Sequence, residues 1–194
     1  MTTKADDGQQ IPDGKSVPEK ETDDMDGISK SERTRRNLPH WQTPGSSYFI
    51  TWDTVKRFIL RPAERTIAFD AIRYWDEDRW IVYCAVIMPN HVHLIVQPLR
   101  LPSAAEPALY PLKTLLHSVK SYSAHQINRQ RERTGAVWLD ERYDRILRDD
   151  EEFWQKWQYI LDNPVKSGLA RVPEEYPLFY ERRSIDSSQP LLPP

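Results

Sequence analysis

The chain has 194 residues, a formal net charge of −2, 39% hydrophobic residues and a single cysteine, Cys84. This length suits one domain with a sizeable core, and one cysteine excludes a disulfide framework or a cysteine-based zinc site within the chain. Because no apolar stretch approaches the length of a membrane span and the N-terminus is polar, we expect a cytoplasmic protein with no membrane partner.

The charges are distributed unevenly along the chain. Residues 1–30 hold four lysines, eight acidic residues and no aromatic residue, so the rest of the chain carries about +2. A segment this poor in apolar residues cannot fold by itself. We therefore expect a disordered acidic tail over 1–30, a folded domain over 31–180 and a loose, polar C-terminal tail over 181–194.

Hydrophobic periodicity and turn residues predict seven elements. They are a strand at 47–52, a helix at 62–76, strands at 80–87 and 91–97, a helix at 110–132, an extended segment at 143–147 and a helix at 150–162. Asp149 and Glu152 are spaced as a capping box for the last helix, and Pro164 is expected to end it. The order β-α-β-β-α-β-α predicts an α+β fold, a ferredoxin-like antiparallel sheet with helices packed on one face.

Two histidines lie two residues apart in the predicted strand at 91–97. Side chains alternate between the faces of a strand, so His91, His93 and Gln97 share one face, opposite the valine and leucine side chains between them. Adjacent imidazoles on a buried face need a metal ion, an anion or solvent in front of them. The pattern fits half of a metal site, or a histidine pair on a solvent-exposed sheet face.

The last predicted helix carries a tyrosine that lies off its apolar stripe. Tyr159 is about 200° around the helix from Trp157, so it shares a face with Gln155 and Asn163. It is either an exposed surface tyrosine or a nucleophile. A phenol can attack phosphorus when a divalent metal polarises the phosphate, and two histidines with the Asn163 carbonyl oxygen would supply three ligands.

Four segments together resemble a known family. They are 38–41 (LPHW), 88–96 (MPNHVHLIV), 138–142 (WLDER) and 159–169 (YILDNPVKSGL). They are similar to the HUH-type single-tyrosine transposases, most closely to the REP-associated tyrosine transposases, and the resemblance runs from about residue 35 to residue 180. It implies a ferredoxin-like nuclease that recognises single-stranded DNA hairpins, requires Mg²⁺ or Mn²⁺, and cleaves and rejoins DNA through a 5′-phosphotyrosine.

The resemblance also implies roles for individual residues. His91 and His93 fall on the metal-binding pair, and Tyr159, carried by the C-terminal helix, falls on the nucleophile. The wider family often has glutamine one turn after the tyrosine, where this chain has Asn163, which is either the third ligand or a helix cap. Tyr122 in the helix at 110–132 is the rival nucleophile, although its spacing predicts a core position.

Basic residues are the candidates for DNA contact. They are Arg33, Arg35, Arg36, Lys113, Lys120, Arg142 and Lys166. Lys113 and Lys120 form a helical stripe with His117, which suits phosphates but is also typical of a solvated helix face. Trp41 and Trp138 are candidates to stack on unpaired bases.

Two other functions fit parts of the pattern. A DNA-hairpin binding protein derived from a transposase could keep this fold without activity. A nucleotide hydrolase of the histidine-triad type would also begin with His-x-His, but it needs a third histidine where this chain has Ile95. Either a monomer or a homodimer is compatible with the family resemblance.

Overall fold

A computed structural model describes residues 42–56, 58–102 and 108–182 of the chain. The predicted acidic tail at 1–30, the candidates Arg33, Arg35, Arg36 and Trp41, and all but the first two residues of the predicted C-terminal tail lie outside the described residues. None of the helices in the described part is both long enough and apolar enough to cross a membrane.

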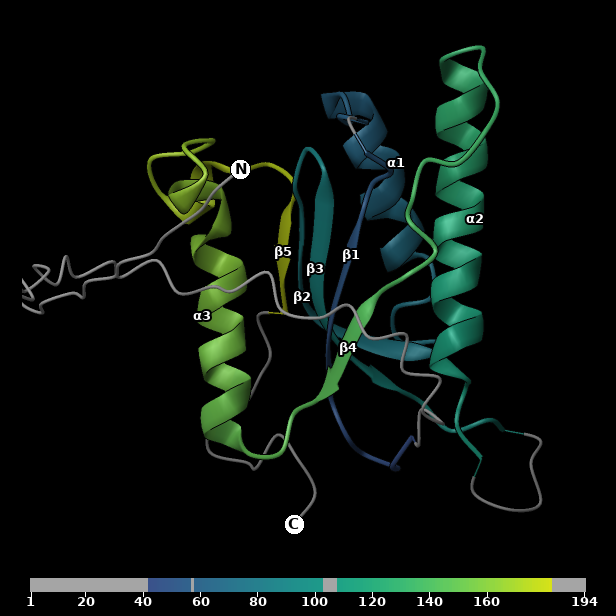
Figure 1. Ribbon diagram of the computed structural model, residues 1–194. Helices are drawn as coiled ribbons and strands as arrows, with labels where there is room; N and C mark the ends of the chain where they lie inside the picture. Colours follow the sequence, from purple (N-terminus) through teal and green to yellow (C-terminus); the bar gives the residue numbers. More distant parts are fainter. Residues whose placement is uncertain (1–41, 57, 103–107, 183–194) are drawn as a thin grey trace, which may run out of the picture. The chain divides into compact units, whose positions relative to one another are not determined.

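The described residues form a five-stranded antiparallel sheet with the strand order β4-β1-β3-β2-β5 (Figure 1). The strands are β1 (Tyr48–Asp53), β2 (Trp80–Ile87), β3 (His91–Pro98), β4 (Tyr143–Ile146) and β5 (Phe179–Glu181). The helices are α1 (Pro62–Arg73), α2 (Leu112–Gln130), α3 (Asp150–Lys166) and the short 3-10 helix η1 (Pro173–Glu175). The predicted α+β class and the antiparallel sheet are confirmed.

The helices cover both faces of the sheet, and not one face as predicted. Trp80 of β2 is buried and donates from Nε1 to the Ile72 carbonyl of α1 at 3.2 Å, whereas the neighbouring Tyr83 packs edge-on against Phe153 of α3. Figure 1 accordingly shows α1 and α2 on one side of the sheet and α3 on the other. The physical reason lies in β3, where Leu94 and Ile95 point to opposite faces and are both fully buried, so each face needs a cover.

Helix α3 begins as predicted but runs past Pro164. The Asp149 carboxylate accepts a hydrogen bond from the Glu152 amide at 2.7 Å, which is the predicted N-cap. Pro164 is buried inside the helix, so its packing offsets the backbone hydrogen bond that a proline cannot make. The helix ends instead at Lys166, and Gly168, with a φ of +68°, forms a Schellman motif just after it.

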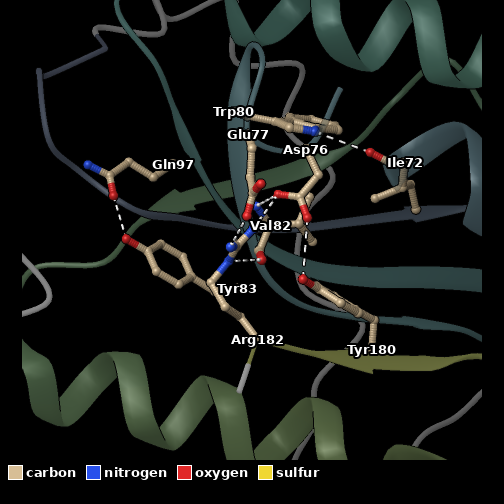
Figure 2. Close-up of polar contacts among 9 residues, drawn as sticks. All are labelled: Ile72, Asp76, Glu77, Trp80, Val82, Tyr83, Gln97, Tyr180 and Arg182. Atoms are coloured by element: carbon tan, nitrogen blue, oxygen red, sulfur yellow. Dashed lines mark hydrogen bonds and ion pairs between the residues drawn. The ribbon is translucent and has the colours of Figure 1, made fainter. Parts of the chain in front are cut away.

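Strand β5 was not predicted, because three residues are too few to show alternation. Arg182, which follows it, joins this sheet edge to the turn between α1 and β2 (Figure 2). Its guanidinium contacts Asp76 at 2.6 Å, Glu77 at 2.7 Å and the Val82 carbonyl at 3.1 Å. Tyr180 donates a further hydrogen bond to Asp76. We call these five residues the Arg182 cluster.

A second closed polar contact joins α1 to the end of α2. Glu64 is only 1% exposed, and it accepts hydrogen bonds from the Arg131 guanidinium and from the Arg61 amide. A buried carboxylate is stable only when it is paired in this way. The contact therefore belongs to the folded framework on the α1 and α2 side of the sheet.

Candidate active site

Strand pairing places the two histidines beside three side chains of β1. In the antiparallel register, His91 lies opposite Asp53 and His93 lies opposite Thr51. Residues paired in this way share a face, so Phe49, two residues before Thr51, lies on the same side. The imidazole rings of His91 and His93 are 4.7 Å apart between centroids. The predicted shared face of the two histidines is thus present, and it is the face that α3 covers.

Each histidine has one ring nitrogen engaged by a neighbour. Nδ1 of His93 lies 2.6 Å from Thr51 Oγ1, and Nδ1 of His91 lies 2.8 Å from Asn90 Oδ1. A hydrogen-bond partner on one ring nitrogen is the arrangement that orients histidine ligands in metal sites.

Burial keeps both imidazoles uncharged at neutral pH. It lowers the pKa of His93 to about 3, and the nearby charges of His91 and Lys156 act in the same direction. Burial also lowers the pKa of His91, against the opposing effects of a hydrogen bond with Asn163 and the charge of Asp53. A neutral imidazole is the form that binds a metal ion, so the electrostatics of this pair suit ligation.

Tyr159 and Asn163 of α3 lie against the histidine pair. The Tyr159 ring is edge-on to His93 at a centroid distance of 5.2 Å, and its side chain is 42% exposed. One turn later, Asn163 is buried, bonds through its side chain to His91, and donates from Nδ2 to the Tyr159 carbonyl at 3.1 Å. The structure therefore brings together His91, His93, Tyr159 and Asn163, with Asn163 inside the helix and not at its C-cap.

Sequence reasoning missed three residues of this cluster. Phe49 is buried beneath it, with its ring stacked on His93 at 5.8 Å and edge-on to Tyr159 at 6.0 Å. Lys156 places Nζ 5.2 Å from the Phe49 ring centroid, and Thr51 holds His93. The i, i+3 spacing of Lys156 and Tyr159 was visible in the sequence, but Phe49 and Thr51 needed the β1–β3 register.

The predicted DNA-contact residues that the structure describes differ in their surroundings. Lys113 is exposed on α2. Lys120 donates from Nζ to the Leu139 carbonyl at 2.6 Å and to the Asp140 carbonyl at 3.1 Å, and burial lowers its pKa. Arg142 pairs with Asp144 at 3.2 Å and Lys166 with Asp162 at 3.3 Å. Among the described candidates, Lys113 has neither an ion pair nor a carbonyl contact, and the role of all seven in DNA contact stays a prediction.

Two aromatic residues differ from their predicted environments. Tyr122 is 56% exposed and not in the core, and it lines a groove with Tyr74 and Trp75, which directly follow α1. That groove lies on the α1 and α2 side of the sheet, away from the histidines. Trp138 is buried, so it is not available to stack on a base. Its Nε1 donates to Ser123 Oγ at 2.9 Å, which gives the buried indole N–H the internal partner that it needs.

Comparisons with known proteins place this chain beside one group. No protein-family model matches it. It is 32% identical over 94 residues to a "Putative REP-associated tyrosine transposase" of Haemophilus influenzae, covering 47% of this chain and 53% of the relative. It is 29% identical over 93 residues to an uncharacterized protein of the same organism, covering 41% and 52%. The chain thus spans about half the length of the curated relatives it matches.

A solved structure shows the same fold. It is described as a REP-associated tyrosine transposase bound to a REP hairpin, and it matches with a TM-score of 0.59 at 19% identity. The match covers 73% of this chain and 80% of the other. The sequence match confirms the family resemblance that the motifs predict, and the structural match confirms the fold.

Proposed function

We propose that this chain, a relative of the REP-associated tyrosine transposases, is a metal-dependent endonuclease and strand transferase that acts on single-stranded DNA beside hairpins. Tyr159 is its nucleophile, and a 5′-phosphotyrosine is its covalent intermediate. The observation that carries the proposal is the position of a half-exposed phenol edge-on to one of two neutral, adjacent histidines.

The side chains around the histidines fit a divalent cation. The two imidazoles and the Asn163 amide oxygen offer three neutral donors, and Thr51 and Asn90 each bond one imidazole ring. We propose that they hold Mg²⁺ or Mn²⁺. When bound, such a cation polarises a phosphate and stabilises the charge that develops on it.

In the proposed reaction, Tyr159 is the residue of the chain that attacks the DNA. Its phenol is fixed between His93 and Phe49 and is open to solvent on its other side. In the reaction, Tyr159 Oη bonds to phosphorus, the bond from phosphorus to the 3′-oxygen breaks, and the phenol proton passes to water while the 3′-oxygen takes one from water. The ester keeps the energy of the broken bond, so a 3′-hydroxyl can reverse the step and rejoin a strand.

We propose hairpin-containing single-stranded DNA as the substrate. The solved relative with the same fold is bound to a REP hairpin. In this chain, Tyr143 is 52% exposed at the β4 edge and lies 6.2 Å from Phe49, where its ring can stack on a base next to the scissile phosphate. Such stacking tolerates different bases, so we expect recognition to depend more on the hairpin than on this contact.

The test is formation of a covalent protein–DNA adduct. Wild type, Tyr159→Phe and Tyr122→Phe are incubated in Mn²⁺ with labelled hairpin DNA from repeats flanking the gene, and the products are separated by denaturing electrophoresis. We expect an adduct with wild type and Tyr122→Phe and none with Tyr159→Phe. Hairpin binding without an adduct by any protein would favour the non-catalytic binding protein, and an adduct with Tyr159→Phe would move the nucleophile elsewhere.

A further inference from the structure

We propose that Lys156 binds a non-bridging oxygen of the scissile phosphate and stabilises the transition state of tyrosine attack. This inference rests on the proposed function and adds a phosphate-contacting cation to the predicted histidines, tyrosine and asparagine. The residue lies on α3, three positions before Tyr159, and at that spacing two side chains emerge from the same side of a helix.

The Lys156 ammonium lies over the aromatic floor of the site. Nζ is 5.2 Å from the ring centroid of Phe49 and 5.9 Å from that of Tyr159. Phe49 is buried and also stacks on His93, so one ring contacts the lysine, the histidine and the tyrosine. The charge of Lys156 therefore lies next to the proposed nucleophile, Tyr159.

No carboxylate of residues 42–56, 58–102 or 108–182 forms an ion pair with Lys156. The neighbouring cations differ, since Arg145 of β4 pairs with Glu152 at 2.6 Å and Lys166 of α3 pairs with Asp162 at 3.3 Å. An aromatic face attracts a cation but does not neutralise it. Lys156 therefore keeps its full charge available for an anion that approaches Tyr159.

The reaction supplies that anion. As Tyr159 Oη bonds to phosphorus and its proton leaves to water, the pentacoordinate transition state carries one more negative charge than the bound diester. A positioned cation stabilises the transition state more than the ground state in this situation. Lys156 stays protonated throughout, and the departing 3′-oxygen takes its proton from water, so the lysine acts by charge and not by proton transfer.

The test compares four proteins in single-turnover adduct formation with hairpin DNA in Mn²⁺. We expect Lys156→Met to slow the reaction about 100-fold and Lys156→Arg to recover to within about tenfold of wild type, because arginine also binds phosphate oxygens. Arg171→Met, which removes a cation that follows α3 and is already paired with Glu175, is the matched control and should keep the wild-type rate. Hairpin affinity should change by less than about threefold in all variants, which separates this role from general DNA binding.

A neutral substrate separates phosphate contact from support of the helix. In a methylphosphonate at the scissile position, one non-bridging oxygen is replaced by a methyl group. With the isomer that lacks the contacted oxygen, we expect Lys156→Met to slow adduct formation by less than about threefold, since the contact is already lost. An equal slowing on both isomers and on the natural phosphate would mean that Lys156 only supports the fold, and would overturn the inference.

Failure of the inference and failure of the proposed function give different results. Wild type that forms no adduct would overturn both. Wild type that forms an adduct at the same rate as Lys156→Met would leave the tyrosine nucleophile in place and overturn only the role of the lysine.

Discussion

Two groups of polar residues, on opposite sides of β2, differ in how completely their side chains are bonded. In the Arg182 cluster, the guanidinium meets two carboxylates and a carbonyl, and Asp76 also accepts from Tyr180 and from the Val82 amide (Figure 2). All three guanidinium nitrogens of Arg182 are bonded within this network. Its effect is on the stability of the fold.

The group around His91, His93, Tyr159, Asn163 and Lys156 is bonded less completely. Thr51 and Asn90 engage one nitrogen of each imidazole, and Asn163 bonds to His91 and to the helix backbone. Among the described residues, the Tyr159 phenol has no hydrogen-bond partner and the Lys156 ammonium has no carboxylate partner. Both groups contain buried polar side chains. The difference indicates that a functional site keeps some polar groups without a partner while its other side chains are held in place, whereas a structural network does not.

The largest expected effect tests the open group. We expect His91→Ala, or EDTA added to wild type, to lower adduct formation by at least about 10³-fold, because the phosphate loses the electrostatic stabilisation that a bound cation supplies. Hairpin binding should persist. Single-turnover electrophoresis measures the loss, with His125→Ala, an exposed histidine of α2, as the control. Cleavage insensitive to both treatments would contradict the metal assignment.

The next effect tests the closed cluster. Arg182→Met leaves the Asp76 and Glu77 carboxylates without their cation, and Asp76 is 7% exposed. We expect a loss of about 3 kcal/mol in the free energy of unfolding, with the adduct rate unchanged at temperatures where the variant is folded. Urea denaturation measures the loss. Arg171→Met, which breaks an exposed pair with Glu175, should cost less than about 0.5 kcal/mol.

A third expectation concerns acid. Burial raises the pKa of Glu64, but the hydrogen bonds and charge of Arg131 lower it more, so the net pKa lies below its ordinary value of 4.5. The folded protein then binds fewer protons than the unfolded chain as pH falls below 4.5. The stabilisation is fully present above that pH and is lost as pH falls through the lower, folded-state value.

We expect Glu64 to contribute up to about 1.4 kcal/mol per pH unit to this acid sensitivity. Urea denaturation of wild type and of Glu64→Gln is measured between about pH 6 and about pH 3. Glu64→Gln should lack that contribution to the acid sensitivity. Glu174→Gln, at an exposed glutamate, is the control. An acid dependence identical in Glu64→Gln and wild type would show that this pair does not couple protonation to folding.

The smallest expected effect concerns the support behind the histidines. Thr51→Val removes the hydroxyl that contacts Nδ1 of His93, and loss of such a partner weakens metal binding by about tenfold. A Mn²⁺ titration of adduct formation should show a higher midpoint with the same maximal rate. Thr66→Val, an exposed position in α1, should leave the midpoint unchanged. A lower maximal rate at saturating Mn²⁺ would mean that Thr51 supports the reaction in another way.

Much of this molecule could be predicted from local patterns. The alternation in β3 places His91 and His93 on one face, and the helical period sets Tyr159 and Asn163 apart from the apolar stripe of α3. The Asp149 cap was visible as a spacing. These features depend on backbone geometry within a few residues, which periodicity reports directly.

Other features were decided by tertiary structure. Which face α3 covers, the burial of Trp138, the carbonyl contacts of Lys120 and the pairing of Thr51 with His93 all depend on residues distant in the chain. Strand register and helix docking bring such residues together, and neither is encoded in a local period. The sequence by itself therefore determined the candidate ligands and nucleophile, whereas packing decided what holds them, what faces them and which nearby charges remain open.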